Sequence, residues 1–116
     1  MKEERKLTAI RVQPGKAPEI IKIRNTLPAF QAEVGGFIEP HLLPFGDVMI
    51  LNDDGKNMGL PVNKILLDRY GATLDYFVGT LLIVASNGIE FGSLSKESQS
   101  HWLKVFSHKT IYIYEL

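Results

Sequence analysis

The chain has 116 residues, 45% of them hydrophobic and 22% charged, which is enough material for one domain with its own core. Thirteen basic residues balance thirteen acidic ones, so the formal net charge is zero and the overall basic charge of a protein that binds DNA or RNA duplexes is excluded. The absence of cysteine excludes a disulfide framework, a thiolate metal site and a thiol nucleophile.

The chain begins with the charged segment 1–5, which we expect to be a flexible arm on a single domain that spans residues 1–116. No hydrophobic core of a signal peptide follows it. The longest apolar run, residues 76–85, is about half the length that a bilayer requires. We therefore expect a cytoplasmic protein without a membrane partner.

Two apolar-rich segments, 7–12 and 19–24, flank the turn dipeptide Pro14-Gly15, and this order predicts a β-hairpin. The next segment has the features of a short helix. Asn25 or Thr26 can cap its amino end, and the pair Gly35-Gly36 ends it.

Residues 37–43 are apolar enough for a strand, but Pro40 cannot donate a hydrogen bond to a neighbouring strand. We therefore place this strand at a sheet edge or at a bulge. Residues 44–47 form its turn, and residues 48–51 read as a strand that is covered on both faces.

The polar segment 51–63 contains Asp54-Gly55, the strongest short-range hairpin signal in the sequence. A calcium loop with Gly55 in its glycine position would need ligands at Ile50 and Pro61, which offer no side-chain oxygen. A phosphate loop would need serine or threonine directly after Lys56, where the sequence has asparagine. A type I′ turn is the remaining interpretation.

After this turn, Asn63 is expected to cap a short helix that continues to Gly71, and residues 76–85 read as the central strand. Beyond a turn at Asn87-Gly88, Ser93 and Ser95 compete to cap a helix that runs through Phe106. The alternating residues 110–114 predict a last strand.

These elements predict the α+β class: one small domain with a mainly antiparallel sheet of about five to seven strands and two or three short helices. We find no repeat, linker or low-complexity segment.

The sequence contains no recognisable catalytic or metal-binding constellation. The three histidines, His41, His101 and His108, lack the close spacing of zinc ligands, and no third ligand is indicated. No serine has the G-x-S-x-G context of a nucleophile, and no pair of acids is fixed in proximity by its spacing. We expect no catalytic residue, no metal and no cofactor, and hence a protein that is not an enzyme.

Binding remains, and a helix amino end beside a cation is a generic anion site. Each candidate ligand-binding residue lies in an exposed turn, at a glycine corner or at the expected helix start at 63, or carries a positive charge. The candidates are Lys16, Gly35, Gly36, Asn63, Lys64 and Arg69. In the last strand, Tyr112 and Tyr114 project to one face and Ile111 and Ile113 to the other. With isoleucines in the core, the tyrosines would be an interface, a stacking platform or cross-strand packing.

Several motifs, taken in order, resemble a family of small phage and mobile-element proteins known as domain of unknown function 3846. They are residues 12–18, 25–27, 34–39, 52–56 with 59–63, 79–80 with 83–84, and 91–95. The Pro40-His41 pair departs from the family's usual pattern. The resemblance supplies no catalytic residues.

What the resemblance implies is a bacterial cytoplasm in which accessory proteins counter host defences. We therefore expect a homo-oligomeric binding protein that sequesters a small anionic or nucleotide-like ligand, such as a defence signal, near Gly35, Gly36, Asn63 and Lys64. The alternative is an inhibitor that binds a host defence protein through Tyr112 and Tyr114.

Overall fold

The fold is given by a computed structural model that describes residues 5–116. The expected flexible arm at residues 1–5 therefore lies outside the described residues except for Arg5. The Arg5 carbonyl accepts a hydrogen bond of 2.9 Å from the Asn25 N–H, so the chain is already paired with the second strand at this point.

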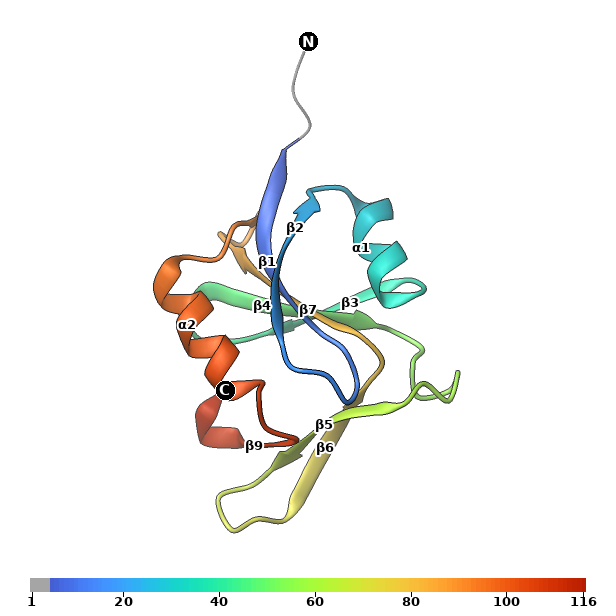
Figure 1. The fold of residues 1–116 in the computed structure, drawn as a ribbon. Helices are drawn as coiled ribbons and strands as arrows, with labels where there is room; N and C mark the ends of the chain where they lie inside the picture. Colours follow the sequence, from blue (N-terminus) through green and yellow to red (C-terminus); the bar gives the residue numbers. More distant parts are fainter. Residues whose placement is uncertain (1–4) are drawn as a thin grey trace.

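The described residues form nine strands in two sheets (Figure 1). Sheet A has the order β2-β1-β7-β4-β3, with β8 paired to β7, and sheet B has the order β6-β5-β9. The strands are β1 (Lys6–Val12), β2 (Glu19–Arg24), β3 (Ile38–Leu42), β4 (Asp47–Asn52), β5 (Val62–Leu67), β6 (Thr73–Val78), β7 (Leu81–Ser86), β8 (Phe91–Gly92) and β9 (Thr110–Tyr112).

The predicted α+β class with a mainly antiparallel sheet is confirmed. Only the β5–β9 pair is parallel among the pairings of the described strands. The helices are α1 (Leu27–Val34) and α2 (Lys96–Val105), with short 3₁₀ helices η1 (Pro44–Gly46) and η2 (Ile113–Glu115). None of the helices formed by residues 5–116 is long and apolar enough to cross a membrane.

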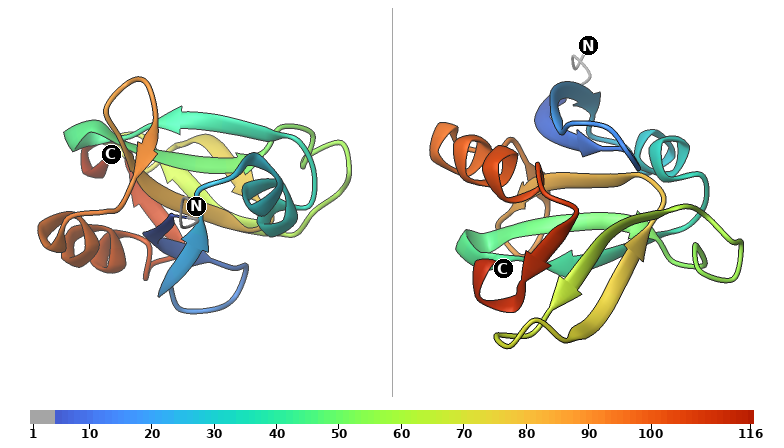
Figure 2. Two further views of the ribbon diagram at one scale, coloured as in Figure 1. Left: turned by 90° about the horizontal axis from the view of Figure 1, so that it is seen from above. Right: turned by 60° about the horizontal axis from the view of Figure 1, so that its bottom comes forward.

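Sheet A is the middle layer of the molecule. Alternate residues of its central strands point to opposite sides, so each side builds its own core. On one side Leu82 and Val84 pack with Phe30 of α1. On the other side Leu81 and Ile83 join the core formed with sheet B and α2, whose largest members are Trp102, Phe106, Met49, Phe77 and Ile111. Figure 2 shows α1 and sheet B on opposite sides of sheet A.

The first third of the chain folds as its residues predict. β1 and β2 pair as an antiparallel hairpin, and the Thr26 hydroxyl caps α1 by accepting the Ala29 N–H at 3.3 Å. Gly35 ends α1 in the left-handed conformation with φ 80°. β3 lies at the edge of sheet A, where Pro40 costs no ladder hydrogen bond, and β4 is buried along its whole length.

The expected central strand at 76–85 is wrong. Gly79 adopts φ 72° and breaks the run, so that β6 joins sheet B and β7 joins sheet A. The apolar run is continuous because both strands face the shared core. From the sequence of this segment alone, two such strands cannot be distinguished from a single long strand.

The expected helix after Asn63 is also wrong, because these residues form β5, the central strand of sheet B. The Asn63 side chain does not cap a helix. Its Nδ2 donates hydrogen bonds to the carbonyls of Val12, at 2.8 Å, and Gly79, at 2.7 Å. Asn63 is only 1% exposed, so this amide fastens β5 to the end of β1 and to the β6–β7 corner.

The segment with Asp54-Gly55 is a turn but not a type I′ hairpin. β4 and β5, which flank it, belong to different sheets, and the left-handed glycine of the loop is Gly59 rather than Gly55. Gly55 has a packing role, because a Cβ there would lie 2.8 Å from Cγ2 of Val78.

At the carboxyl end, Ser95 rather than Ser93 caps α2, since its hydroxyl accepts the Ser98 N–H at 3.1 Å. The last strand stops at Tyr112 instead of residue 114, because η2 follows directly. Consequently Ile111 is buried as expected, whereas Ile113 does not share its core position.

Candidate functional site

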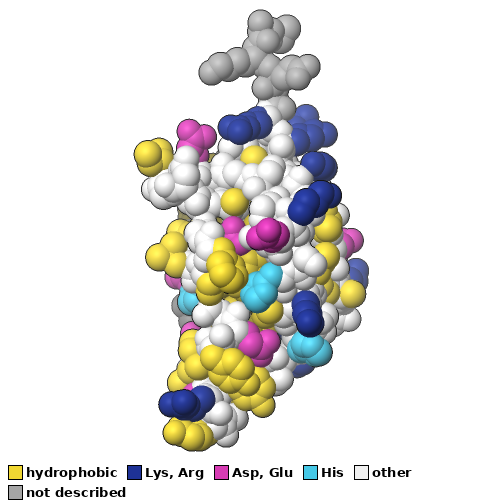
Figure 3. Space-filling model, turned by 90° about the vertical axis from the view of Figure 1, so that its left-hand side faces the viewer, with side chains coloured by type: hydrophobic (Ala, Val, Ile, Leu, Met, Phe, Trp, Pro, Cys, Tyr) yellow, Lys and Arg dark blue, Asp and Glu magenta, His cyan; other side chains and the backbone are white. Residues whose placement is uncertain are grey.

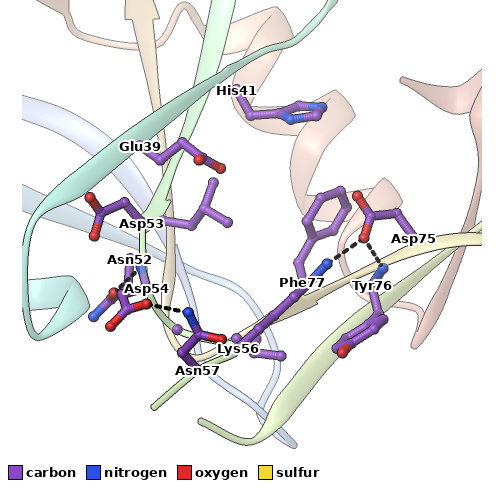
Figure 4. A pocket seen from close by; sticks show the side chains of 13 residues that line it. Glu39, His41, Asn52, Asp53, Asp54, Lys56, Asn57, Asp75, Tyr76 and Phe77 are labelled. Atoms are coloured by element: carbon purple, nitrogen blue, oxygen red, sulfur yellow. Dashed lines mark hydrogen bonds and ion pairs between the residues drawn. The ribbon is translucent and has the colours of Figure 1, made fainter. Parts of the chain in front are cut away.

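One pocket, of about 340 Å³, opens between β3, the loop after β4 and β6 (Figure 4). Its side chains come mostly from these three segments, two of which belong to sheet A and its loop and one to sheet B. The polar and aromatic residues that line it are Glu39, His41, Asn52, Asp53, Asp54, Lys56, Asn57, Asp75, Tyr76 and Phe77.

This acidic pocket carries four carboxylates and one lysine, and the lysine is already engaged. The Lys56 ammonium lies 2.7 Å from Oδ1 of Asp75 and 4.3 Å from the centre of the Tyr76 ring. The hydrogen bond to Lys56 lowers the pKa of Asp75, and the same bond raises the pKa of Lys56. The excess negative charge disfavours an anionic ligand, and within residues 5–116 no group of three or more acidic or histidine side chains is arranged to hold a metal ion.

A second concavity, of about 560 Å³, lies beside α2, and we call it the α2 groove. It is lined by Pro44, Phe45, His101, Lys104, Val105, His108, Tyr114 and Glu115. Figure 3 shows this side of the molecule, where histidine and basic side chains lie among hydrophobic ones.

The helical repeat places three of these side chains together. His101, Lys104 and Val105 follow the i, i+3, i+4 spacing of one helix face. α2 ends at Val105, yet His108 still reaches the groove from the segment that follows. The sequence signal for this site is the spacing 101, 104, 105, 108, which places two histidines and a lysine at one side of α2.

Phe45 forms the opposite wall of the groove in an unusual backbone conformation. Its φ of 67° is the only positive value for a non-glycine residue in the described part of the chain, and this conformation costs a bulky residue about 1–2 kcal/mol. Phe45 is 74% exposed, and its ring centre lies 5.4 Å from that of His101 in an edge-to-face contact. A strained and exposed aromatic residue is an indication of function.

The α2 groove lacks the excess of acids that lines the acidic pocket. One lysine, Lys104, and one acid, Glu115, line it together with two histidines. The Glu115 carboxylate is partly occupied, because it accepts the Tyr112 N–H at 3.0 Å. The groove therefore combines a lysine and two imidazoles with the exposed aromatic residues Phe45 and Tyr114, an arrangement suited to an aromatic anion.

The six residues that the sequence indicated as ligand-binding all lie elsewhere. Gly35 and Gly36 end α1, and a Cβ at Gly36 would come within 2.9 Å of Nδ2 of Asn52, so packing alone requires a glycine there. Lys16 lies exposed in the β1–β2 turn, where its N–H donates to the Gln13 carbonyl at 3.1 Å.

The remaining candidates lie along β5 and the turn after it. Asn63 and Lys64 are buried at the start of β5, and burial lowers the pKa of Lys64. Arg69 lies beyond the other end of the strand, with its guanidinium 5.6 Å from the centre of the Tyr70 ring. None of the six predicted ligand residues lines the acidic pocket or the α2 groove, and the helix amino end that motivated Asn63 does not exist.

The two tyrosines of the predicted interface are placed together. Their rings stack with centres 5.2 Å apart and planes 20° apart, and Tyr114 lines the α2 groove while Tyr112 belongs to β9. Of the eight ligand and interface residues that the sequence predicted, Tyr114 is therefore the one that lines the acidic pocket or the α2 groove.

Comparison with known proteins gives one match. A family model described as "Domain of unknown function (DUF3846)" matches residues 7–107. This range includes β1 from its second residue and all of β2 to β8, and it ends before β9. No curated protein and no solved structure matches the chain.

Proposed function

Because the chain belongs to the DUF3846 family of domains of unknown function, its activity has to be argued from its own residues, and we propose that it binds and sequesters a small anionic, nucleotide-like ligand in the α2 groove. The ligand's ring lies between Phe45 and Tyr114, and its anionic group meets Lys104, with His101 and His108 beside it.

The observation that carries the proposal is the backbone of Phe45. A residue in a strained conformation is kept only where the surrounding structure imposes it, and strain of this kind is common at ligand sites. Here the strain leaves a large aromatic side chain largely in solvent, at the rim of a groove with a lysine and two histidines. The acidic pocket provides no comparable match to an anion.

Binding is favoured over catalysis by the way the groove's polar groups are connected. Within residues 5–116, neither groove histidine makes a hydrogen bond to a carboxylate or a hydroxyl, the contact that would orient it as a general base. The polar groups of the α2 groove are therefore arranged to hold a charged ligand rather than to transfer a proton.

Isothermal titration calorimetry with a panel of linear and cyclic nucleotides tests the proposal. We expect at least one nucleotide to bind, and Lys104→Ala to weaken its affinity by about tenfold or more because a charge-assisted contact is lost. Lys16→Ala is the matched control, since it removes an equal charge from a distant turn. Failure of the whole panel to bind, or equal losses in both variants, would show that the α2 groove is not the site.

Phe45→Gly separates a binding role from a structural one. Glycine tolerates φ 67°, so relief of strain offsets the lost ring contacts, and the free energy of unfolding should change by no more than about 1 kcal/mol. Ligand affinity should nevertheless fall by about tenfold because the stacking surface is gone. A variant that loses stability but binds normally would assign Phe45 a structural role instead.

A further inference from the structure

A second hollow adjoins the α2 groove at the amino end of α2. It has a volume of about 290 Å³ and is lined by Phe45, Ser95, Glu97, Ser98 and His101. We call it the amino-end pocket. Phe45 and His101 line the α2 groove as well, so the two hollows meet at the edge-to-face contact between these rings. A ligand bound in the groove therefore has the amino-end pocket directly beside it.

The helical repeat places Glu97 on the same face of α2 as the residues of the groove. Glu97, His101 and Lys104 follow the i, i+4, i+7 spacing of one helix face. At a rise of 1.5 Å per residue, the step from 97 to 104 covers about 10 Å along the helix axis. A carboxylate thus lies at one end of this face and an ammonium at the other, with an imidazole between them.

The Ser98 hydroxyl is the observation that points to a ligand in the amino-end pocket. Ser98 is only 9% exposed and lines the pocket, and within residues 5–116 its hydroxyl makes no hydrogen bond. Its backbone N–H already donates to the Ser95 hydroxyl, so α2 is capped without the Ser98 side chain. A buried hydroxyl without a partner costs stability, and a polar ligand group in this pocket would supply the missing partner.

Glu97 adds an acceptor to the same pocket. Its side chain is exposed, and among the described residues no ion pair engages its carboxylate. The helix dipole favours an acid in the first turn, which explains the charge of Glu97 but not the unpartnered hydroxyl beside it. A carboxylate repels a second anionic group, whereas it accepts strong hydrogen bonds from hydroxyl groups. The amino-end pocket is therefore suited to hydroxyls rather than to another phosphate.

We propose that the amino-end pocket binds the sugar hydroxyls of a ribonucleotide whose base and phosphate occupy the α2 groove. This assignment rests on the function proposed above, because the ligand is the same, and it adds recognition of the sugar. The 2′- and 3′-hydroxyls of a ribonucleotide project from one face of the sugar ring, and the base and the 5′-carbon project from the other. A ligand of this shape presents its hydroxyls to Glu97 and Ser98 while its phosphate meets Lys104.

Isothermal titration calorimetry with AMP, GMP and CMP and with their 2′,3′-dideoxy counterparts tests the sugar site. We expect a ribonucleotide that binds the wild-type chain to bind about tenfold or more tightly than its dideoxy form, because two hydrogen bonds are lost. Glu97→Ala and Ser98→Ala should each reduce this ratio by about threefold, since each removes the partner of one hydroxyl.

Ser98→Ala also separates ligand binding from a structural role. Because the hydroxyl has no partner within residues 5–116, its removal should not lower the free energy of unfolding in urea, whereas the loss of a hydroxyl that holds α2 in place would lower it. Glu90→Ala is the matched control for Glu97→Ala. It removes an equal charge from the exposed turn between β7 and β8 and lines neither hollow, so the ratio should stay unchanged.

The sugar site and the α2 groove can fail separately in this experiment. Equal affinity for the ribonucleotide and its dideoxy form, together with weaker binding of both in Lys104→Ala, would overturn the sugar site and leave the groove as the anion site. A preference for the ribonucleotide that persists undiminished in both Glu97→Ala and Ser98→Ala would also overturn the sugar site. If no nucleotide binds, both assignments are wrong.

Discussion

Single residues in this protein show how burial decides what a polar side chain can do. Asn63 is buried with its amide nitrogen fully used, and its Oδ1 has no hydrogen-bond partner among the described residues. Next to it, Lys64 is only 6% exposed. Both residues were expected to meet a ligand, and instead they lie at the junction of the two sheets, where burying a polar group costs stability.

Replacing Lys64 with methionine should stabilise the protein. Burial and the nearby Lys109 lower the Lys64 pKa below the ordinary value of 10.5, so the folded chain binds fewer protons than the unfolded chain between these two pKa values. The stability cost of burying the Lys64 ammonium therefore falls as the pH rises through that window, and the wild-type protein becomes more stable. Lys64→Met should add about 1 kcal/mol to the free energy of unfolding at neutral pH, and the gain should shrink towards pH 10.5.

Urea unfolding at several pH values measures this effect, with Lys96→Met as the control. Lys96 is exposed at the start of α2, and its replacement should change stability by no more than about 0.5 kcal/mol. A gain that grows with pH, or a loss of stability in Lys64→Met, would show that the ammonium is stabilised where it lies.

At the scale of elements, glycines decide which sheet a segment joins. Gly79 separates β6 from β7 with φ 72°, and a Cβ there would lie 2.8 Å from Cδ1 of Leu60. The chain crosses from one sheet to the other at this residue. The neighbouring Asn63 amide donates to the Gly79 carbonyl and fixes the corner.

Gly79→Ala should therefore lower the free energy of unfolding by about 2–4 kcal/mol, because the backbone strain and the clash with Leu60 add. Gly71→Ala is the matched control, since it has φ 89° but nothing within 4 Å of the added Cβ, and it should cost only the strain of about 1–2 kcal/mol. Equal midpoints for the two variants in urea would mean that the Leu60 side chain moves aside at no cost.

The same glycine explains where reading the sequence succeeds and where it fails. Local signals were sufficient for α1, because a capping hydroxyl and a left-handed glycine act within one turn of helix. They were insufficient for residues 76–85, since both halves of the run face one core and only the partner strands differ. β5 was mistaken for a helix because Asn63 resembles a cap, and its real partners, Val12 and Gly79, are 51 and 16 residues away.

The candidate site was less accessible to sequence reasoning than the fold. The α2 groove combines η1, α2 and the end of the chain, and the contact between Phe45 and His101 depends on how these segments pack. Tyr114 was found because strand alternation is a local rule. The positive φ of Phe45 has no sequence signal of its own, since the glycine of Pro44-Phe45-Gly46 is left-handed as well, with φ 76°, and it alone would be expected to be so.

Across the whole molecule, three layers are held together by a few polar contacts as well as by apolar packing. On the α1 side, Arg11 of β1 binds Glu33 of α1 through two nitrogens, with Nε 2.8 Å from Oε2, and Glu33 raises the pKa of Arg11. On the other side, Nε1 of Trp102 in α2 donates to Oδ2 of Asp47 in β4 at 2.7 Å. Both partners of this second contact are buried, so it is the stronger constraint on the position of α2.

The Trp102–Asp47 contact predicts that α2 and sheet A unfold as one unit, and a double-mutant cycle can measure their coupling. Asp47→Ala leaves a buried indole N–H without an acceptor, and Trp102→Phe leaves a buried carboxylate without its donor, so each should cost about 2–4 kcal/mol. In the double variant neither group is left unpaired, and the total cost should be about 1–2 kcal/mol less than the sum of the single costs.

Thermal unfolding followed by far-ultraviolet circular dichroism suits all four chains, because Trp102 is the only tryptophan and its fluorescence is lost in two of them. Single costs that add to within about 0.5 kcal/mol would mean that apolar packing alone holds α2 on the sheet, since independent contacts give additive losses.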